Sequence, residues 1–246
     1  LLNEEDIDLL LGYNNYGFDF PYLWNRAKEL GILDKFRKLS KFKDRLLQGK
    51  FKNMSSSAMG DNKWFDIDHP GRVQIDIMKV LRNDVTKKLD MYKLDFVASV
   101  FMRGKIKDIL YENNYTIFKT DSLEGVHSES YIKLTYTKCH TNEYYGEGKN
   151  GEGDKFQITE ILEDGSGFKV KGKIEIDQKL GWSWTMAKDD VSPQDIFRLQ
   201  KQGPEERTII AKYCIKDVVL CVELCKKLKI VINNISMANV CGVPFS

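Results

Sequence analysis

One long helix near the C-terminal end constrains the fold of this chain more than any other stretch. Residues 211–228 are helical in character without a break, and apolar residues before and along them form a stripe: Ile209, Ile210, Val219, Leu220, Leu224 and Leu228. Tyr213 and Asp217 are four residues apart, so their side chains share a face of this helix. An acid with a phenol one turn before it suits holding a metal ion and orienting a water molecule. Alone the pair is a weak signal, because an Asp on a helix is commonly only a solvated charge.

A second stretch near the N-terminus strengthens this interpretation. Residues 7–11 form a short apolar run before a turn, which predicts a buried, parallel strand. Residues 21–30 predict a helix, with Pro in its first turn and Gly just past its end. Asn14 and Asp19 therefore lie on a strand-to-helix turn, where sites collect in open α/β sheets. The alternative is that Asp19 only favours the start of the helix.

Composition limits the classes of function. The 246 residues are 42% hydrophobic, enough to bury the core of one large domain or of one domain with an insertion. The formal net charge of +2 gives no general support for nucleic-acid binding, so any nucleic-acid contact must come from local patches. Five Cys without a Cys-x-x-Cys pair and three His indicate no zinc site and suit a reducing compartment. No apolar run approaches the ~20 residues of a membrane span, so we expect no membrane partner.

The stretches that follow the first helix are basic and rich in turn signals. Residues 33–48 look helical and carry a basic cluster: Lys35, Arg37, Lys38, Lys41, Lys43 and Arg45. Residues 55–70 have turn signals at both ends and predict an exposed hairpin. A strand is expected at 72–78, and helices are expected near 79–89, 93–102 and 192–201.

Residues 105–181 have a different pattern of apolar and polar residues from the flanking helical stretches. This pattern predicts a small antiparallel β unit inserted between helices. Apolar and polar residues alternate at 131–137, 156–161 and 168–176. The stretch 143–154 contains two Gly-x-Gly pairs. No strand-to-helix context surrounds these pairs and no Gly-Lys-Ser/Thr follows, so we expect a flexible loop rather than a phosphate-binding loop.

Five stretches, taken in order, resemble one protein family. Gly12-Tyr-Asn14-x-x-x-Phe18-Asp19-x-Pro21-Tyr-Leu23 is similar to the second exonuclease motif of the family B DNA polymerases, and Tyr213-Cys-x-Lys-Asp217 is similar to the third. Between them, Gly71-Arg-Val-Gln-Ile-Asp76 and Tyr92-Lys-Leu-x-x-Val97 match segments of the family in the same order, and Met237-Ala-x-Val-x-Gly-Val-Pro-Phe-Ser246 looks like the bridge to the polymerase domain. The chain therefore resembles the proofreading exonuclease region of the delta-type enzymes and their relatives in large DNA viruses.

The chain departs from the family pattern at the first exonuclease motif. The family carries an Asp-x-Glu on a strand upstream of the second motif. Here only about a dozen residues precede Asn14, and Glu4-Glu5-Asp6 is not followed by the strand and helix that should separate the two motifs. We therefore interpret the chain as a fragment that lacks this motif and also lacks the palm motifs of the polymerase.

The resemblance implies a metal-dependent mechanism with named residues. Two Mg²⁺ ions, with Mn²⁺ as the alternative, would support hydrolysis of a phosphodiester at the DNA 3′ end. Asp19 would hold the second ion and Asp217 the ion that activates the nucleophile. Tyr213 would orient the attacking water, and Asn14 would hydrogen-bond the terminal nucleotide. Phe18 would lie near a frayed base, with ordinary packing as the alternative.

The implied fold class is α/β, a ribonuclease H-like exonuclease fold that lacks its first strands, with a small antiparallel β insertion. Four segments are expected: residues 1–104 as the first part of the exonuclease domain, 105–181 as the β insertion, 182–232 as the last part of the exonuclease domain, and 233–246 as the start of the bridge.

The function implied by the resemblance is that of a DNA-directed DNA polymerase in DNA replication that extends 3′ ends and removes mismatched ones. Its partners would be primer–template DNA, a single-stranded 3′ end and the rest of the polymerase chain, with a sliding clamp as a further candidate. We expect it inside the cell, in the host nucleus or a viral factory for a viral enzyme. The alternatives are a non-catalytic DNA-binding module and a stand-alone ribonuclease H-like exonuclease. The bridge-like segment argues against a stand-alone enzyme.

Overall fold

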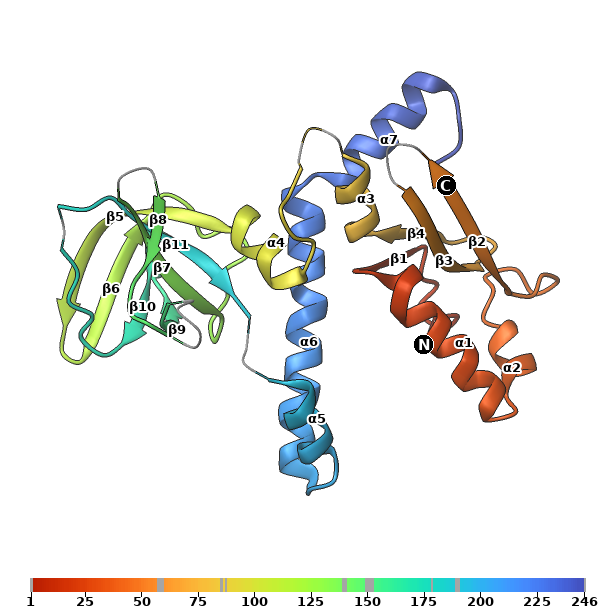
Figure 1. Cartoon of the computed structure of the whole chain (residues 1–246), viewed down its shortest axis with the longest axis horizontal. Coiled ribbons are helices and arrows are strands. Elements are labelled where there is room, and N and C mark those ends of the chain that lie inside the picture. The colour runs from red at the N-terminus through yellow and green to blue at the C-terminus, as the bar shows by residue number, and fades with distance from the viewer. Residues whose placement is uncertain are drawn as a thin grey trace. The chain divides into compact units, whose positions relative to one another are not determined.

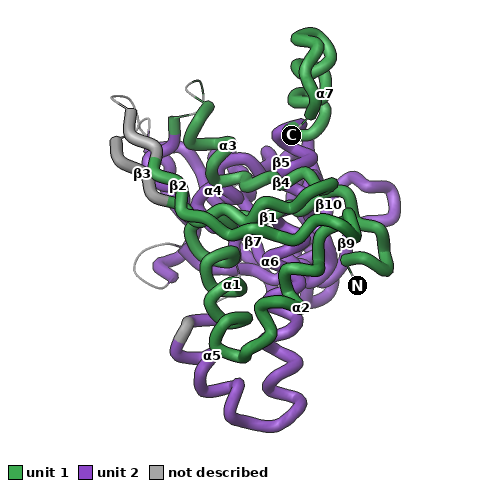
Figure 2. Tube along the Cα trace, turned by 90° about the vertical axis from the view of Figure 1, so that its right-hand side faces the viewer, with its two compact units in different colours: residues 1–88, 230–246 green, residues 89–229 purple. Residues whose placement is uncertain are grey.

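The protein is described by a computed structural model that divides into two compact units (Figure 2). Unit 1 contains residues 1–88 and 230–246, and unit 2 contains residues 89–229. The described residues are 2–56, 60–84, 86, 88–138, 141–148, 153–177, 179–188 and 191–245. Within these ranges, no helix combines the length and the apolar character that a membrane span requires.

Unit 1 is a mixed α/β unit built on a pair of short parallel strands (Figure 1). Its elements are β1 Leu9–Gly12, the π-helix η1 Asn15–Asp19, α1 Phe20–Glu29, α2 Leu33–Arg37, β2 Gln48–Ser56, β3 Gly60–Asp68, β4 Val73–Asp76, α3 Ile77–Asn83 and α7 Ile230–Cys241. β1 pairs with β4 in parallel, with Gly12 opposite Asp76, and β2 pairs with β3 as an antiparallel hairpin. The parallel strand expected at 7–11 and the helix expected at 21–30 are both confirmed.

An aromatic cluster forms the core of unit 1 beneath helix α1. The buried members are Phe20, Trp24, Leu47, Phe65 and Ile67. The ring of Trp24 lies 5.9 Å from that of Phe65, and Gly49 lies so close that a Cβ there would come within 2.8 Å of the Trp24 ring. The base of the hairpin is therefore part of the core.

Two expectations for this region need correction. The helix expected at 33–48 ends at Arg37, because the chain turns back and Arg37 and Leu47 exchange hydrogen bonds: Leu47 N donates to Arg37 O and Arg37 Nε donates to Leu47 O. Leu47 is fully buried, so its burial in the core outweighs the continuation of the helix. The hairpin expected at 55–70 is longer than predicted, since β2 begins at Gln48, and its inner end is buried rather than exposed. Residues 57–59 of that prediction lie outside the described residues.

Unit 2 combines a β-barrel with helices (Figure 1). Its elements are α4 Leu94–Phe101, β5 Arg103–Glu112, β6 Tyr115–Thr120, β7 Tyr131–Lys138, β8 Thr141–Tyr144, β9 Lys155–Ile161, β10 Gly167–Lys171, β11 Trp182–Ala187, α5 Pro193–Gln200 and α6 Pro204–Lys227. The sheet runs in the order β11-β5-β6-β10-β9-β7-β8, and β11 also pairs with β7. This second pairing closes the sheet into an antiparallel barrel, with β8 attached to β7.

The barrel interior is filled by large apolar side chains. Those that are fully buried include Phe118, Ile132, Leu134, Ile158, Phe168 and Trp184. Trp184 Nε1 donates a hydrogen bond of 2.8 Å to Thr120 Oγ1, so the one polar atom of the indole is satisfied inside the barrel.

The antiparallel β unit expected at 105–181 is present, but its limits differ. The barrel begins at Arg103 and is completed by β11, which lies beyond residue 181 and closes the sheet. The strand expected at 168–176 ends at Lys171, because Gly172 adopts a left-handed φ of 99°. The Gly-rich stretch 143–154 begins in β8 and continues as a loop, and its residues 149–152 lie outside the described residues.

Helix α6 confirms the long helix on which the sequence interpretation depends. It runs for 24 residues, and its buried residues are Cys221, Leu224 and Cys225. Both Cys side chains are therefore packed in the interior of unit 2. Of the predicted apolar stripe, Leu224 is buried, whereas Ile209 and Val219 are exposed. Helix α5 packs beside α6, and α4 contacts both α6 and β11, which anchors the barrel to the long helix.

Candidate active site

The turn after β1 carries three of the residues expected at the site. Asn14 adopts a left-handed backbone conformation with φ 63° and ψ 32°, which Asn tolerates better than most residues. The π-helix that follows ends at Asp19, and such helices occur frequently at functional sites. A Cβ at Gly17 would lie 2.4 Å from Asn14 Oδ1, so the Asn14 side chain folds over a position that needs Gly.

Asp76 holds this turn from the neighbouring strand. Its carboxylate accepts hydrogen bonds from Asn14 N at 2.9 Å and from Tyr16 N at 3.4 Å. It also accepts from Met78 N at 3.0 Å and Lys79 N at 3.4 Å, and thereby caps helix α3. The turn and the start of α3 are thus joined through one side chain.

The Asp19 carboxyl has a perturbed acidity. Partial burial raises its pKa, and the negative charge of Asp76 raises it further, against a hydrogen bond to its own backbone that lowers it. Phe18 is 65% exposed and stacks on Tyr22, with ring centroids 6.3 Å apart. An exposed aromatic ring beside a carboxylate suits contact with a nucleobase.

A cation lies between two aromatic rings beside the same turn. Lys79 Nζ is 4.9 Å from the ring centroid of Tyr16 and 4.4 Å from that of Trp64 on β3. Burial raises the pKa of Tyr16 to about 12, and the charges of Asp66 and Asp76 add to this effect. Tyr16 is therefore a neutral phenol that helps to connect the hairpin to the turn.

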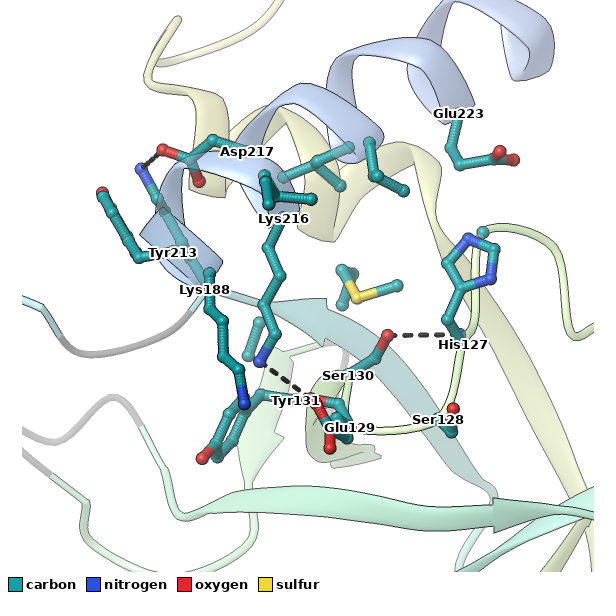
Figure 3. A pocket seen from close by; sticks show the side chains of 17 residues that line it. His127, Ser128, Glu129, Ser130, Tyr131, Lys188, Tyr213, Lys216, Asp217 and Glu223 are labelled. Carbon is teal, nitrogen blue, oxygen red and sulfur yellow. Dashed lines mark hydrogen bonds and ion pairs between the residues drawn. The ribbon is translucent and has the colours of Figure 1, made fainter. Parts of the chain in front are cut away.

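In unit 2, Tyr213 and Asp217 lie on one face of α6, as predicted, and a lysine from the barrel joins them (Figure 3). Lys188, directly after β11, forms an ion pair of 2.8 Å with Asp217, and its Nζ lies 4.8 Å from the ring centroid of Tyr213. Burial lowers the pKa of Lys188, but hydrogen bonds to Asp217 and Tyr213 and their charges outweigh it, so the pKa is raised overall.

These three residues line a pocket of about 440 Å³ between the barrel and α6. Figure 3 shows Lys188, Tyr213 and Asp217 gathered at one end of it, and His127 and Glu223 at the other. Its central wall is largely apolar, and the remaining lining residues are Gly125, Ser128, Glu129, Ser130, Tyr131, Met186, Ala187, Lys212, Ile215, Lys216, Val219 and Leu220. The pocket therefore combines a largely apolar wall with ionisable side chains at both ends.

The structure groups the predicted residues into two sets. Asn14, Phe18 and Asp19 lie on one turn of unit 1, and Tyr213 and Asp217 lie on α6 in unit 2. Two carboxylates that share a metal pair should lie within about 4–8 Å of each other, and this remains a prediction for Asp19 and Asp217. Among the described residues, no group of three or more His, Cys, Asp or Glu side chains forms a metal site.

Sequence reasoning missed two residues that contact the predicted ones. Asp76 is the last residue of the 71–76 segment that resembles the family. The resemblance marked this segment, but nothing in the sequence indicated that Asp76 contacts the turn after β1. Lys188 had no such signal, because its contact with Asp217 depends on the path of β11.

Comparisons with known proteins agree with these motifs. Residues 1–97 match the family described as "DNA polymerase family B, exonuclease domain". The whole chain is 39% identical to a DNA polymerase of Pyramimonas orientalis virus and 33% identical to one of Phaeocystis pouchetii virus, and it spans 18% and 24% of those proteins. It is 28% identical, over 98% of its length, to the DNA polymerase delta catalytic subunit of Dictyostelium discoideum, of which it spans 14%. The chain belongs to the family B DNA polymerases, as part of their exonuclease region.

Proposed function

We propose that this chain supplies most of the 3′→5′ proofreading exonuclease of a DNA-directed DNA polymerase that acts in DNA replication. The observation that carries the proposal is the cluster of Tyr213, Asp217 and Lys188 at one end of the pocket beside α6. The parallel pairing of β1 with β4, with Asp19 on the turn that follows, supports a ribonuclease H-like fold. The partners would be DNA with a primer 3′ end, the rest of the polymerase and a sliding clamp.

The donor set fits hard divalent cations. Asp19 and Asp217 offer carboxylate oxygens, the ligands that Mg²⁺ prefers, and Mn²⁺ would be accepted by the same oxygens. When bound, two such ions would lower the pKa of the attacking water and neutralise charge on the leaving 3′ oxygen. In this proposal Asp19 holds one ion and Asp217 holds the other.

The remaining residues position the substrate and the nucleophile. Tyr213 lies one helical turn from Asp217, and its hydroxyl would hydrogen-bond and orient the attacking water. Lys188 would keep Asp217 in place and lend positive charge to the phosphate as negative charge accumulates on it. Phe18 would stack on a frayed base and Asn14 would hydrogen-bond the terminal nucleotide.

The β2–β3 hairpin would help to part the primer end from the template. Two observations support this role. Phe51 on its first strand is 62% exposed, and Trp64 on its second is joined through Lys79 to the turn that leads to Asp19. The hairpin is thus connected to the turn through the middle of its second strand, where Trp64 pairs with Lys52.

The test compares two charge-removing substitutions on the same helix of the full-length polymerase. Asp217→Asn should abolish most Mg²⁺-dependent release of 3′-terminal nucleotides from single-stranded DNA, a loss of at least about 10²-fold, while dNTP incorporation is retained. Glu205→Gln removes an acidic charge from the exposed first turn of α6 and should leave excision unchanged. Full excision by Asp217→Asn would refute the assignment. Equal loss in both variants would also count against it, because the effect would then come from the helix rather than from the site.

A further inference from the structure

We propose that Asp76 is a positioning residue of the exonuclease, which holds the turn that carries Asn14 and Asp19 in its working geometry. The inference rests on the proposed function. It concerns a buried residue at the end of strand β4, whereas the residues proposed to meet DNA lie on the turn after β1.

The position of Asp76 follows from the strand pairing. In the parallel register of β1 with β4, Gly12 lies opposite Asp76, so both strands end at the same edge. A Cβ at Gly12 would lie 2.1 Å from Asn15 Oδ1, so the chain folds back tightly as soon as β1 ends. Asp76 is only 4% exposed and lies beneath this fold-back.

The hydrogen bonds of Asp76 perform two separate tasks. The bonds from Met78 N and Lys79 N cap helix α3. The bonds from Asn14 N at 2.9 Å and Tyr16 N at 3.4 Å cross to the other strand's turn, some sixty residues away in the sequence. Only the second pair constrains the residues that lead to Asp19.

The constraint continues along the turn through backbone hydrogen bonds. Asn14 O accepts from Gly17 N at 3.1 Å and from Phe18 N at 3.0 Å. Holding the backbone of Asn14 in place therefore fixes the first turn of the π-helix that ends at Asp19. Without the hydrogen bonds from Asn14 N and Tyr16 N to Asp76, Asn14 could leave its left-handed conformation, and the Asp19 carboxylate would move with the π-helix. A displacement of about 1 Å at a catalytic group can cost about 10²-fold in rate.

Two substitutions separate the bridge from the cap. Asp76→Ser keeps an N-cap acceptor for α3, because Ser is among the preferred N-cap residues, but its shorter side chain does not reach Asn14 N. Asp76→Asn keeps Oδ1, the atom that accepts from Asn14, Met78 and Lys79. A bridging role predicts loss with Ser and rescue with Asn, whereas a capping role predicts little effect from either.

The experiment measures kcat and KM for release of 3′-terminal nucleotides from single-stranded DNA by the full-length polymerase. For Asp76→Ser we expect kcat to fall by at least about tenfold with dNTP incorporation retained. The free energy of unfolding should fall as well, because the backbone N–H groups of Asn14 and Tyr16 lose their buried acceptor. For Asp76→Asn we expect excision within about threefold of the unsubstituted enzyme.

Two outcomes would overturn the inference. One is an Asp76→Ser enzyme whose kcat lies within about twofold of the unsubstituted enzyme, which would show that the bridge is not needed. The other is loss of excision in Asp76→Asn as complete as in Asp217→Asn, which would assign the effect to the charge of Asp76. If Asp76→Ser does not fold, Asp76→Thr takes its place with the same expected result, because Thr is also an accepted N-cap residue and its side chain is too short to reach Asn14 N. Retained excision in Asp217→Asn would instead refute the proposed function, so the two failures are distinguishable.

Discussion

The closure of the barrel predicts a steric effect at Gly104 that can be worked out from interatomic distances. Gly104 pairs with Trp184 across β5 and β11. A Cβ at Gly104 would lie 2.5 Å from Trp184 Nε1, 2.8 Å from Thr120 Oγ1 and 2.9 Å from Ser122 O. The φ of Gly104 is not left-handed, so Ala there is strained only by these close approaches. We expect Gly104→Ala to lower the stability of the barrel by about 1–3 kcal/mol, the usual cost of overpacking a core.

A double-mutant cycle tests whether Trp184 is the source of this cost. Trp184→Phe removes the indole nitrogen nearest to the new methyl group and also the hydrogen bond to Thr120. Alone it should cost about 1 kcal/mol for the hydrogen bond, plus a further cost for the smaller ring. In the double variant, part of the overpacking is relieved. Its loss of stability should therefore be smaller than the sum of the losses in the two single variants, by at least about 0.5–1 kcal/mol. The close approaches to Thr120 and Ser122 O remain, so the relief is partial.

Hydrogen exchange of amides in β5 and β11 measures the local opening free energy without requiring the whole chain to unfold in one step. Gly181→Ala is the matched control, because no atom lies within 4 Å of a Cβ at Gly181 and its φ is not left-handed. Gly181→Ala should leave barrel protection nearly unchanged. Additive costs for Gly104→Ala and Trp184→Phe, to within about 0.3 kcal/mol, would refute the contact with Trp184 as the source of strain.

Four further predictions concern the site, the pH dependence and DNA binding. Lys188→Met should slow excision, with kcat reduced by at least about tenfold, because Asp217 loses its ion-pair partner; an unchanged kcat would show that the pair is structurally incidental. Burial chiefly lowers the pKa of His69, so stability present above pH ~6.5 should be lost as pH falls through the lower folded-state pKa, with a slope of up to about 1.4 kcal/mol per pH unit. His69→Asn should flatten that slope in unfolding experiments at several pH values. Deleting the outer hairpin should reduce excision from duplex ends more than from single strands, and equal losses would contradict strand separation. Replacing both Lys38 and Lys43 by Gln should reduce the slope of log affinity for single-stranded DNA against log salt by about 0.7 for each phosphate that these lysines neutralise, whereas an unchanged slope would place the DNA-binding residues elsewhere.

Only part of the basic cluster at residues 35–45 is substituted to test the salt dependence of DNA binding, because some of its members interact within the protein. Lys41 forms ion pairs with Asp6, at 3.2 Å, and with Asp8, and these interactions raise its pKa. Arg37 is occupied by the carbonyl oxygen of Leu47. A charge count along the sequence cannot separate lysines that serve the fold from those that are available to DNA, because ion pairs depend on which segments meet in space.

Local signals in the sequence predicted local structure well. The turn after β1, the helix with Pro in its first turn and the long helix α6 are all set by residues close to one another in the chain, and each is present. The helix expected at 33–48 failed for the opposite reason. Helical propensity in 38–48 competes with burial of Leu47 against residues of α1 and β3, and tertiary packing outweighs a propensity difference of under about 1 kcal/mol per residue.

The interactions of the candidate site likewise divide into those set by residues close in the sequence and those set by tertiary structure. Tyr213 and Asp217 could be placed together from their spacing, because one helix carries both. Asp76 reaches Asn14 only through the register of β1 with β4, and a shift of one residue would point it to the other face of the sheet. Its role could therefore be inferred only once the register was known.

Lys188 depends on still more distant structure, and this links the barrel to the proposed chemistry. It reaches Asp217 because β11, which ends one residue earlier, closes the barrel, and because α4 packs on both β11 and α6. The insertion is thus braced against the helix that carries the proposed metal ligand. If β11 positions Lys188, then Gly104→Ala should weaken excision as well as barrel protection, since it strains the pairing of β5 with β11. If hydrogen-exchange protection of the barrel amides falls and the excision rate does not, the packing of α4 on α6 holds Lys188 in place instead. The pairing of β5 with β11 would then not contribute to the geometry of the proposed site.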